Sequence, residues 1–102
     1  MGMVKKFDVY LYESKTHTKP CVVISPDEMN VLLPYVVIAP ITKVQRAFPC
    51  RVGVKLKGEA GQIALDLMRI TSKAKLVKRA GALPDNLKKE IQELLKEFFN
   101  LK

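Results

Sequence analysis

The stretch that decides the fold spans residues 21–39 and reads CVVISPDEMNVLLPYVVIA. It opens with a short apolar run, Cys21–Ile24, and closes with a second one, Tyr35–Ala39, which Pro40 is expected to stop. Bounded apolar runs of this length, rich in Val and Ile, are typical of buried strands. The stretch therefore predicts two strands inside a sheet.

The link between these two strands has the signature of a short helix. Ser25 is expected to be its N-cap, Pro26 its first helical residue, and Glu28 the side chain that closes a capping box. Pro34 follows soon afterwards and cannot continue a helix. The helix is therefore expected to be brief.

Further strands are expected on both sides of this stretch. Phe7–Tyr12 consists of strand-forming residues, and Arg51–Leu56 alternates in a way that leaves one face exposed. The other segments predict a polar loop over Glu13–Lys19, a loop over Ile41–Pro49, a turn over Lys57–Gly61 and a strand over Gln62–Leu65.

The last part of the chain predicts one long helix that begins near Pro84 and Asp85. Phe99 and Leu101 fall outside the apolar stripe of this helix, whose members are given below, and are expected either to make a dimer contact or to fray. Short strands in series plus one terminal helix predict a mainly β fold with α, a small curled β-barrel with the helix packed on it. The stripe has helical spacing and consists of Leu87, Ile91, Leu94, Leu95 and Phe98.

Size and charge narrow the class of protein. The chain has 102 residues, of which 48% are hydrophobic and 27% charged, so a single globular domain over residues 1–102 is expected. Lys and Arg number 18 against 10 Asp and Glu, which gives a net charge of +8. This bias favours an anionic partner such as nucleic acid, an acidic peptide or a membrane surface.

Several other classes are excluded by the residues themselves. The longest nearly apolar run, from Val31 to Ile41, contains two prolines and is too short to span a bilayer, and the first residues lack a signal-peptide pattern. Cys21 and Cys50 form no disulfide framework and are expected to be small buried groups, and His17 alone cannot build a multi-histidine metal site. We therefore expect a cytoplasmic protein without metal or cofactor.

A set of short motifs then follows in a recognisable order over nearly the whole chain. They are Thr18–Ser25, Val37–Thr42, Phe48–Val52, Gly61, Leu65–Arg69 and Leu76–Gly81, with the helix last. In this order and spacing the chain resembles the MazF/PemK (Kid-type) toxins of toxin–antitoxin systems. The resemblance implies an SH3-like β-barrel with a C-terminal helix, and a homodimer.

The same resemblance implies an activity and partners. Such toxins are metal-independent endoribonucleases that cut single-stranded RNA, typically mRNA, and leave a 2′,3′-cyclic phosphate and a 5′-hydroxyl. It also implies a cognate antitoxin that lays a disordered acidic segment across the RNA site, with operator DNA contacted only through the antitoxin and no membrane partner.

Cleavage of RNA by its own 2′-hydroxyl needs a base, an acid for the leaving 5′-oxygen, and donors for the anionic phosphorane. The resemblance implies that Lys19 and Thr42 are catalytic; without it, they would be a solvated lysine and a turn hydroxyl. Lys19 stands where the family usually has Arg. Lys lacks the planar guanidinium that can bind two phosphate oxygens at once, but it remains a cationic donor and acid. A weakened enzyme is therefore expected rather than an inactive one.

The base stays open: His17, the one side chain that titrates near neutrality, is one candidate catalytic residue, Glu13 is another, and as a lone histidine His17 could equally be an exposed residue without a role. The most basic part of the chain, Arg69–Arg79, contains no acid and predicts a track for the RNA backbone. Phe48 either stacks on a base or packs under its loop with Pro49. The candidate RNA contacts are Lys43, Arg46, Arg69, Lys73 and Lys75.

Two other functions remain open at this stage. One is a catalytically silent module of the same fold that binds RNA or antitoxin without cutting. The other is poisoning of DNA gyrase, because the first strand also resembles that of the sister CcdB toxins. The terminal Trp-Gly-Ile of those toxins is absent here, so this alternative ranks below the ribonuclease.

Overall fold

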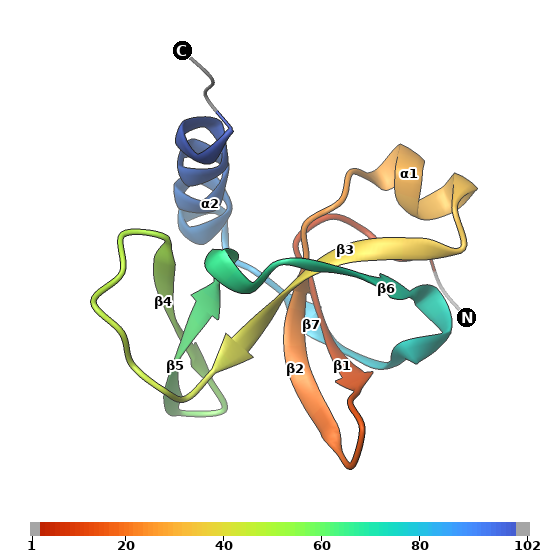
Figure 1. Ribbon diagram of the computed structural model, residues 1–102, viewed down its shortest axis with the longest axis horizontal. Coiled ribbons are helices and arrows are strands. Elements are labelled where there is room, and N and C mark those ends of the chain that lie inside the picture. The colour runs from red at the N-terminus through yellow and green to blue at the C-terminus, as the bar shows by residue number, and fades with distance from the viewer. Residues whose placement is uncertain (1–2, 100–102) are drawn as a thin grey trace.

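The computed structural model describes residues 3–99, which form a curled, wholly antiparallel sheet with a helix at its C-terminal end (Figure 1). This arrangement confirms the predicted mainly β fold with a terminal helix. The elements are β1 (Asp8–Glu13), β2 (Thr18–Val23), α1 (Asp27–Leu32), β3 (Tyr35–Thr42), β4 (Arg51–Leu56), β5 (Glu59–Ala64), the 3-10 turn η1 (Leu65–Leu67), β6 (Arg69–Ser72), the 3-10 turn η2 (Lys73–Lys75), β7 (Leu76–Ala82) and α2 (Asp85–Phe98).

Strand β3 holds the sheet together because it takes part in both of its halves. The strand order is β4-β5-β3-β2-β1-β7, and β6 also pairs with β3. The first part of β3 pairs with β6, its middle with β2, and its last two residues, Ile41 and Thr42, with β5. Figure 1 shows β3 crossing from the side of α1 to the side of β5.

Two prolines lie inside strands rather than at their ends. Pro20 belongs to β2 and Pro40 to β3, so the predicted stop at Pro40 and the predicted loop from Ile41 are wrong. The pairing of β2 with β3 ends at Cys21–Pro40. Neither proline has an N–H group to donate between β2 and β3, and beyond this pair β3 is paired only with β5, on its other edge.

The hairpin between β4 and β5 is tighter than the sequence suggests. Its turn consists of Lys57 and Gly58, which both have positive φ (50° and 82°), as a two-residue hairpin loop with strand-matching twist requires. The turn predicted over Lys57–Gly61 is thus too long, and β5 starts at Glu59 instead of Gln62.

The predicted capping box at α1 is also wrong. The N-cap is Pro26, and no side chain caps the helix. The hydroxyl of buried Ser25 instead donates to Asn30 Oδ1 and accepts from the backbone N–H of Val37 at 3.1 Å. Ser25 therefore ties α1 to β3, which is a tertiary role that a local pattern does not reveal.

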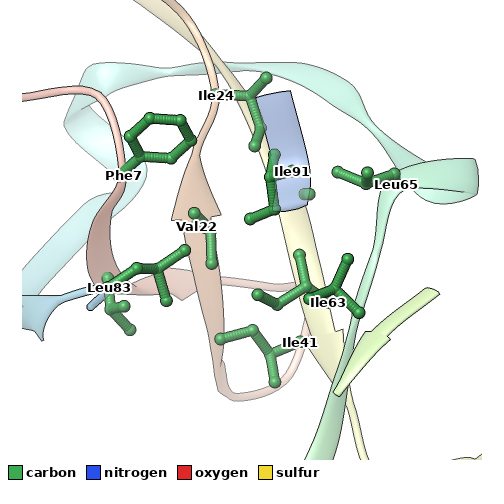
Figure 2. Close-up of a cluster of buried hydrophobic side chains, with 11 residues drawn as sticks. Phe7, Val22, Ile24, Ile41, Ile63, Leu65, Leu83 and Ile91 are labelled. Carbon is green, nitrogen blue, oxygen red and sulfur yellow. The ribbon is translucent and has the colours of Figure 1, made fainter. Parts of the chain in front are cut away.

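The larger core lies between the sheet and α2 (Figure 2). Ile91 is fully buried in it, whereas Phe98 is 47% exposed and stands beside Phe99, so Phe98 does not extend the apolar stripe as predicted. Leu101 lies outside the described residues. Between residues 3 and 99, no helix is long and apolar enough to cross a membrane. The buried members of this core are Phe7, Val9, Val22, Ile24, Ala39, Ile41, Val52, Ile63, Leu65, Leu83 and Ile91.

The smaller core lies on the opposite face of β1, β2 and β3, because successive strand residues point to opposite faces. Cys21 is fully buried here. We call the side of the sheet that carries the residues of this core the inner face. Its buried members are Val4, Tyr10, Tyr12, Cys21, Val23, Val36, Ile38 and Leu76.

The two thiols are expected to differ in reactivity. Burial raises the pKa of the Cys21 thiol to about 12, whereas Cys50 is partly exposed. Because the thiolate is the reactive species, a thiol reagent near neutral pH should label one cysteine in the folded protein and two in denaturant. Cys50→Ser should remove the fast-reacting thiol; two fast thiols in the native protein would contradict this burial of Cys21.

Candidate functional site

Lys19 lies on the inner face near the start of β2. It is exposed, and it stands directly opposite Tyr12 of β1, so the two side chains are neighbours. Strand alternation places it on the same face as Cys21, two residues further along. In the part of the chain that is described, no carboxylate lies within 4.0 Å of its ammonium.

Thr42 ends β3 on the same face. Thr42 lies two residues after Pro40, and Lys19 lies two residues before Cys21, so strand alternation puts both on the face of the Cys21–Pro40 pair, beyond which β2 and β3 are no longer paired. The Thr42 hydroxyl accepts from the N–H of Val44 at 3.1 Å and still has its own hydrogen to donate. Gly61 lets β5 pass close by, since a Cβ there would lie 3.2 Å from the Thr42 carbonyl oxygen.

Arg69 joins Lys19 on the inner face from the other side of the sheet. It begins β6 opposite Ile38, and its Nη2 donates to the Tyr12 hydroxyl at 3.0 Å. Three predicted residues, Lys19, Thr42 and Arg69, are thus carried by one face of the sheet.

The loop between β3 and β4 is held in shape by a cluster that the sequence did not reveal. Arg51 is 6% exposed at its side chain and forms a two-pronged ion pair with Asp66, with Nε–Oδ1 at 2.6 Å and Nη2–Oδ2 at 3.1 Å. Gln62 accepts from the N–H of Arg46 at 3.0 Å and donates to its carbonyl at 3.1 Å. These bonds fix the loop beside Thr42.

This loop carries three of the predicted contacts. Lys43 forms an exposed ion pair with Glu59 at 3.0 Å, so its charge is partly compensated. Arg46 is exposed, and its backbone is bound by Gln62. Phe48 is 47% exposed and lies under the Arg51 guanidinium at 5.2 Å, so it packs inside the loop on one face only.

Lys73 and Lys75 lie apart from this group, in η2 beyond the far end of β6. The Lys73 ammonium donates to the Asn30 carbonyl at the end of α1, at 2.7 Å. The basic run from Arg69 to Arg79 is thus divided between two strands and a turn. Arg69 contacts Tyr12, the neighbour of Lys19, whereas Arg79 stands opposite Tyr10 and is paired with Asp8. The role of the two lysines in RNA binding stays a prediction.

The two candidate bases differ in where they lie. His17 is exposed in the turn before β2, with its Nδ1 2.7 Å from the Thr16 hydroxyl. Glu13 stands opposite Thr18, and strand alternation turns it to the opposite face from Tyr12 and Lys19. Glu13 therefore faces away from Lys19, whereas His17 lies in the turn that leads into β2, and its role as the base stays a prediction.

Asp66 gives this site a measurable pH dependence. The Arg51 guanidinium, through its hydrogen bonds, holds the pKa of the Asp66 carboxyl below its ordinary value. A lowered folded-state pKa contributes stability above the unfolded value of about 3.9, and this contribution is lost as the pH falls through the folded value. Chemical denaturation from about pH 5 to about pH 2 should therefore show a steeper loss for the native protein than for Asp66→Asn.

The matched control is Glu93→Gln on the exposed face of α2, which should follow the native curve. Identical slopes for the native protein and Asp66→Asn would show that the ion pair contributes nothing to folding.

The inner face thus offers two cations beside Tyr12, Lys19 and Arg69, and carries the Thr42 hydroxyl on the same side of the sheet. Neighbouring cations without carboxylates attract an anion, and a phosphodiester presents the charge and the acceptor oxygens that suit them. Across the described residues, no three His, Cys, Asp or Glu side chains are arranged so that they could hold a metal ion.

Comparison with protein families identifies the class to which this fold and site belong. Residues 5–99 match the family described as the PemK-like, MazF-like toxin of type II toxin–antitoxin systems. The chain therefore belongs to the PemK/MazF-like toxin family. Among curated proteins, no match was found.

Solved structures share the fold. An endoribonuclease in complex with its cognate antitoxin from Mycobacterial species superposes with a TM-score of 0.85 at 20% identity, covering 97% of each chain. A MazE–MazF complex from Deinococcus radiodurans gives 0.85 at 15% identity, covering 100% of each chain. The Mycobacterium tuberculosis toxin MazF-mt6 gives 0.81 at 18% identity, over 93% of this chain and 98% of the other.

Proposed function

We propose that the protein is a ribonuclease toxin that cuts single-stranded RNA, typically mRNA, without a metal ion. The observation that supports the proposal is that Lys19 and Arg69 both neighbour Tyr12, on the face of the sheet that also carries Thr42, in a member of the PemK/MazF-like toxin family. The solved structures with this fold include a protein described as an endoribonuclease.

The reaction is an internal transfer of the phosphoryl group. The 2′-oxygen attacks its own 3′-phosphorus while a base takes the hydroxyl proton, and the bond from phosphorus to the 5′-oxygen breaks. A proton delivered to that oxygen yields a 5′-hydroxyl and leaves a 2′,3′-cyclic phosphate. His17 is proposed as the base and Lys19 as the acid and cationic donor, with Thr42 donating to a phosphate oxygen.

The partners follow from the same proposal. Structures with this fold include toxins bound to antitoxins, among them the cognate complex from Mycobacterial species and MazE–MazF from Deinococcus radiodurans. We propose that this chain forms a homodimer in the cytoplasm and is inhibited by an antitoxin whose acidic disordered segment covers the inner face. Operator DNA would then be contacted through the antitoxin.

The test is incubation of the purified protein with mixed-sequence single-stranded RNA in EDTA, followed by analysis of the new ends. Fragments with 2′,3′-cyclic phosphate and 5′-hydroxyl ends are expected. Binding without cleavage would replace the enzyme with a silent binding module of the same fold. DNA breaks that depend on gyrase, with intact RNA, would favour the CcdB-like alternative.

A further inference from the structure

Tyr12 and Arg69 form a contact that no local pattern in the sequence suggests. They are 57 residues apart, and Nη2 of Arg69 donates to the Tyr12 hydroxyl at 3.0 Å. The Arg69 guanidinium carbon also lies 5.6 Å from the centre of the Tyr12 ring. The tyrosine thus holds the guanidinium both by its hydroxyl and by its ring face.

The contact spans the inner face of the curled sheet. Arg69 is on β6 and Tyr12 on β1, with β3 and β2 between them in the strand order. Three strand spacings amount to about 14 Å in a flat sheet, so curling is what brings the two side chains together. Lys19 is on β2, directly opposite Tyr12, and therefore neighbours the pair.

Arg69 differs from Arg51 and Arg79 in the group that its guanidinium contacts. Arg51 pairs with Asp66 and Arg79 with Asp8, whereas within residues 3–99 Arg69 forms no ion pair with a carboxylate. Tyr12 is 4% exposed, so its position is set by packing, while Arg69 itself is exposed. An aromatic support fixes the guanidinium and leaves its full charge available to an anion.

We propose that Tyr12 is a positioning residue that holds the Arg69 guanidinium beside Lys19. There the guanidinium binds two oxygens of the substrate phosphate, which the Lys19 ammonium alone cannot do. This inference rests on the proposed function and deepens it. An ammonium is a point charge, whereas a guanidinium presents parallel N–H groups to two phosphate oxygens. Arg69 in this way supplies the bidentate phosphate contact that Lys19 cannot make.

The first experiment compares Tyr12→Phe with Tyr10→Phe. Both tyrosines are 4% exposed, lie on β1 and belong to the smaller core, so Tyr10→Phe is a matched control for removing a tyrosine hydroxyl from this strand. Tyr12→Phe is expected to lower kcat/KM for RNA cleavage about tenfold, since one hydrogen bond to a charged group is lost. Tyr10→Phe should cleave at the native rate.

A second measurement separates positioning from a general loss of structure. In an Arg69→Ala background, which should itself cleave about a hundredfold more slowly, Tyr12→Phe is expected to have no further effect. A merely structural role for the hydroxyl would lower activity equally in both backgrounds, and this result would overturn the inference.

Binding provides a readout without cleavage. With a single-stranded oligonucleotide whose riboses are 2′-O-methylated, the slope of log affinity against log salt should be shallower in Arg69→Ala by about 0.7, the value of one phosphate contact. Tyr12→Phe should change the slope in the same direction, and an unchanged slope in Arg69→Ala would exclude the phosphate contact.

The outcomes also distinguish this inference from the function on which it rests. If the native protein cleaves RNA and Tyr12→Phe cleaves equally fast, the positioning role is wrong and the ribonuclease stands. If the native protein does not cleave RNA, the proposed function is wrong, and the salt slopes alone decide whether Arg69 contacts phosphate.

Discussion

Lys19→Ala is expected to slow RNA cleavage by about 10²–10⁴-fold, the usual contribution of a positioned acid or base. The reason is that Lys19 is both the proposed proton donor to the leaving 5′-oxygen and a charge beside the phosphate. Its side chain is exposed and belongs to neither core, so the melting temperature should stay close to the native value. Initial rates on a defined RNA and a thermal unfolding curve measure both quantities.

Two further variants sharpen this prediction. Lys19→Arg keeps the positive charge and adds a planar guanidinium that can bind two phosphate oxygens, so it should retain more activity than Lys19→Ala. Lys55→Ala removes another exposed strand lysine, on β4, and should cleave at the native rate. Native cleavage by Lys19→Ala would remove this residue from the mechanism, and an equal loss in Lys55→Ala would point to overall charge instead.

Ile91→Ala is expected to destabilise the protein by about 2–5 kcal/mol, the usual cost of an Ile-to-Ala change in a core. This is a large part of the total of about 5–15 kcal/mol that holds a domain together. Ile91 is fully buried, and Figure 2 shows it among the core residues contributed by the sheet, so its loss leaves a cavity where α2 meets the strands.

Urea unfolding measures this effect, with Gln92→Ala as the control on the exposed face of the same helix. The control should stay within about 0.5 kcal/mol of the native protein. A midpoint for Ile91→Ala close to that of the control would show that α2 does not depend on this contact.

The buried strands could be predicted from the sequence because their residues carry the signal locally. Cys21–Ile24 and Tyr35–Ala39 are apolar runs with β-branched residues, and most of each lies in β2 and β3. The errors at Pro40 and at the β4–β5 turn have another origin. A strand can continue through a proline when a partner on its other edge holds it, as β5 holds β3 beyond its pairing with β2, and partner choice is a property of the whole sheet.

The candidate site was predicted only in part, for a similar reason. The resemblance indicates Lys19 and Thr42, and the basic run indicates Arg69, but strand register and sheet curvature decide that they share one face. The contact between Tyr12 and Arg69 joins residues 57 positions apart, so it depends on curling and not on local sequence. Lys73 looked equivalent to Arg69 as a charge in a basic run, yet its ammonium binds the end of α1.

The central claim is that Lys19 and Thr42 act together on one phosphate, and a double-mutant cycle of cleavage rates tests it most directly. Residues that act as a unit show strongly non-additive effects, so the double variant Lys19→Ala, Thr42→Ala should be about as slow as the slower single variant. Independent, multiplying losses, or native cleavage by Thr42→Ala, would contradict a shared site on the inner face.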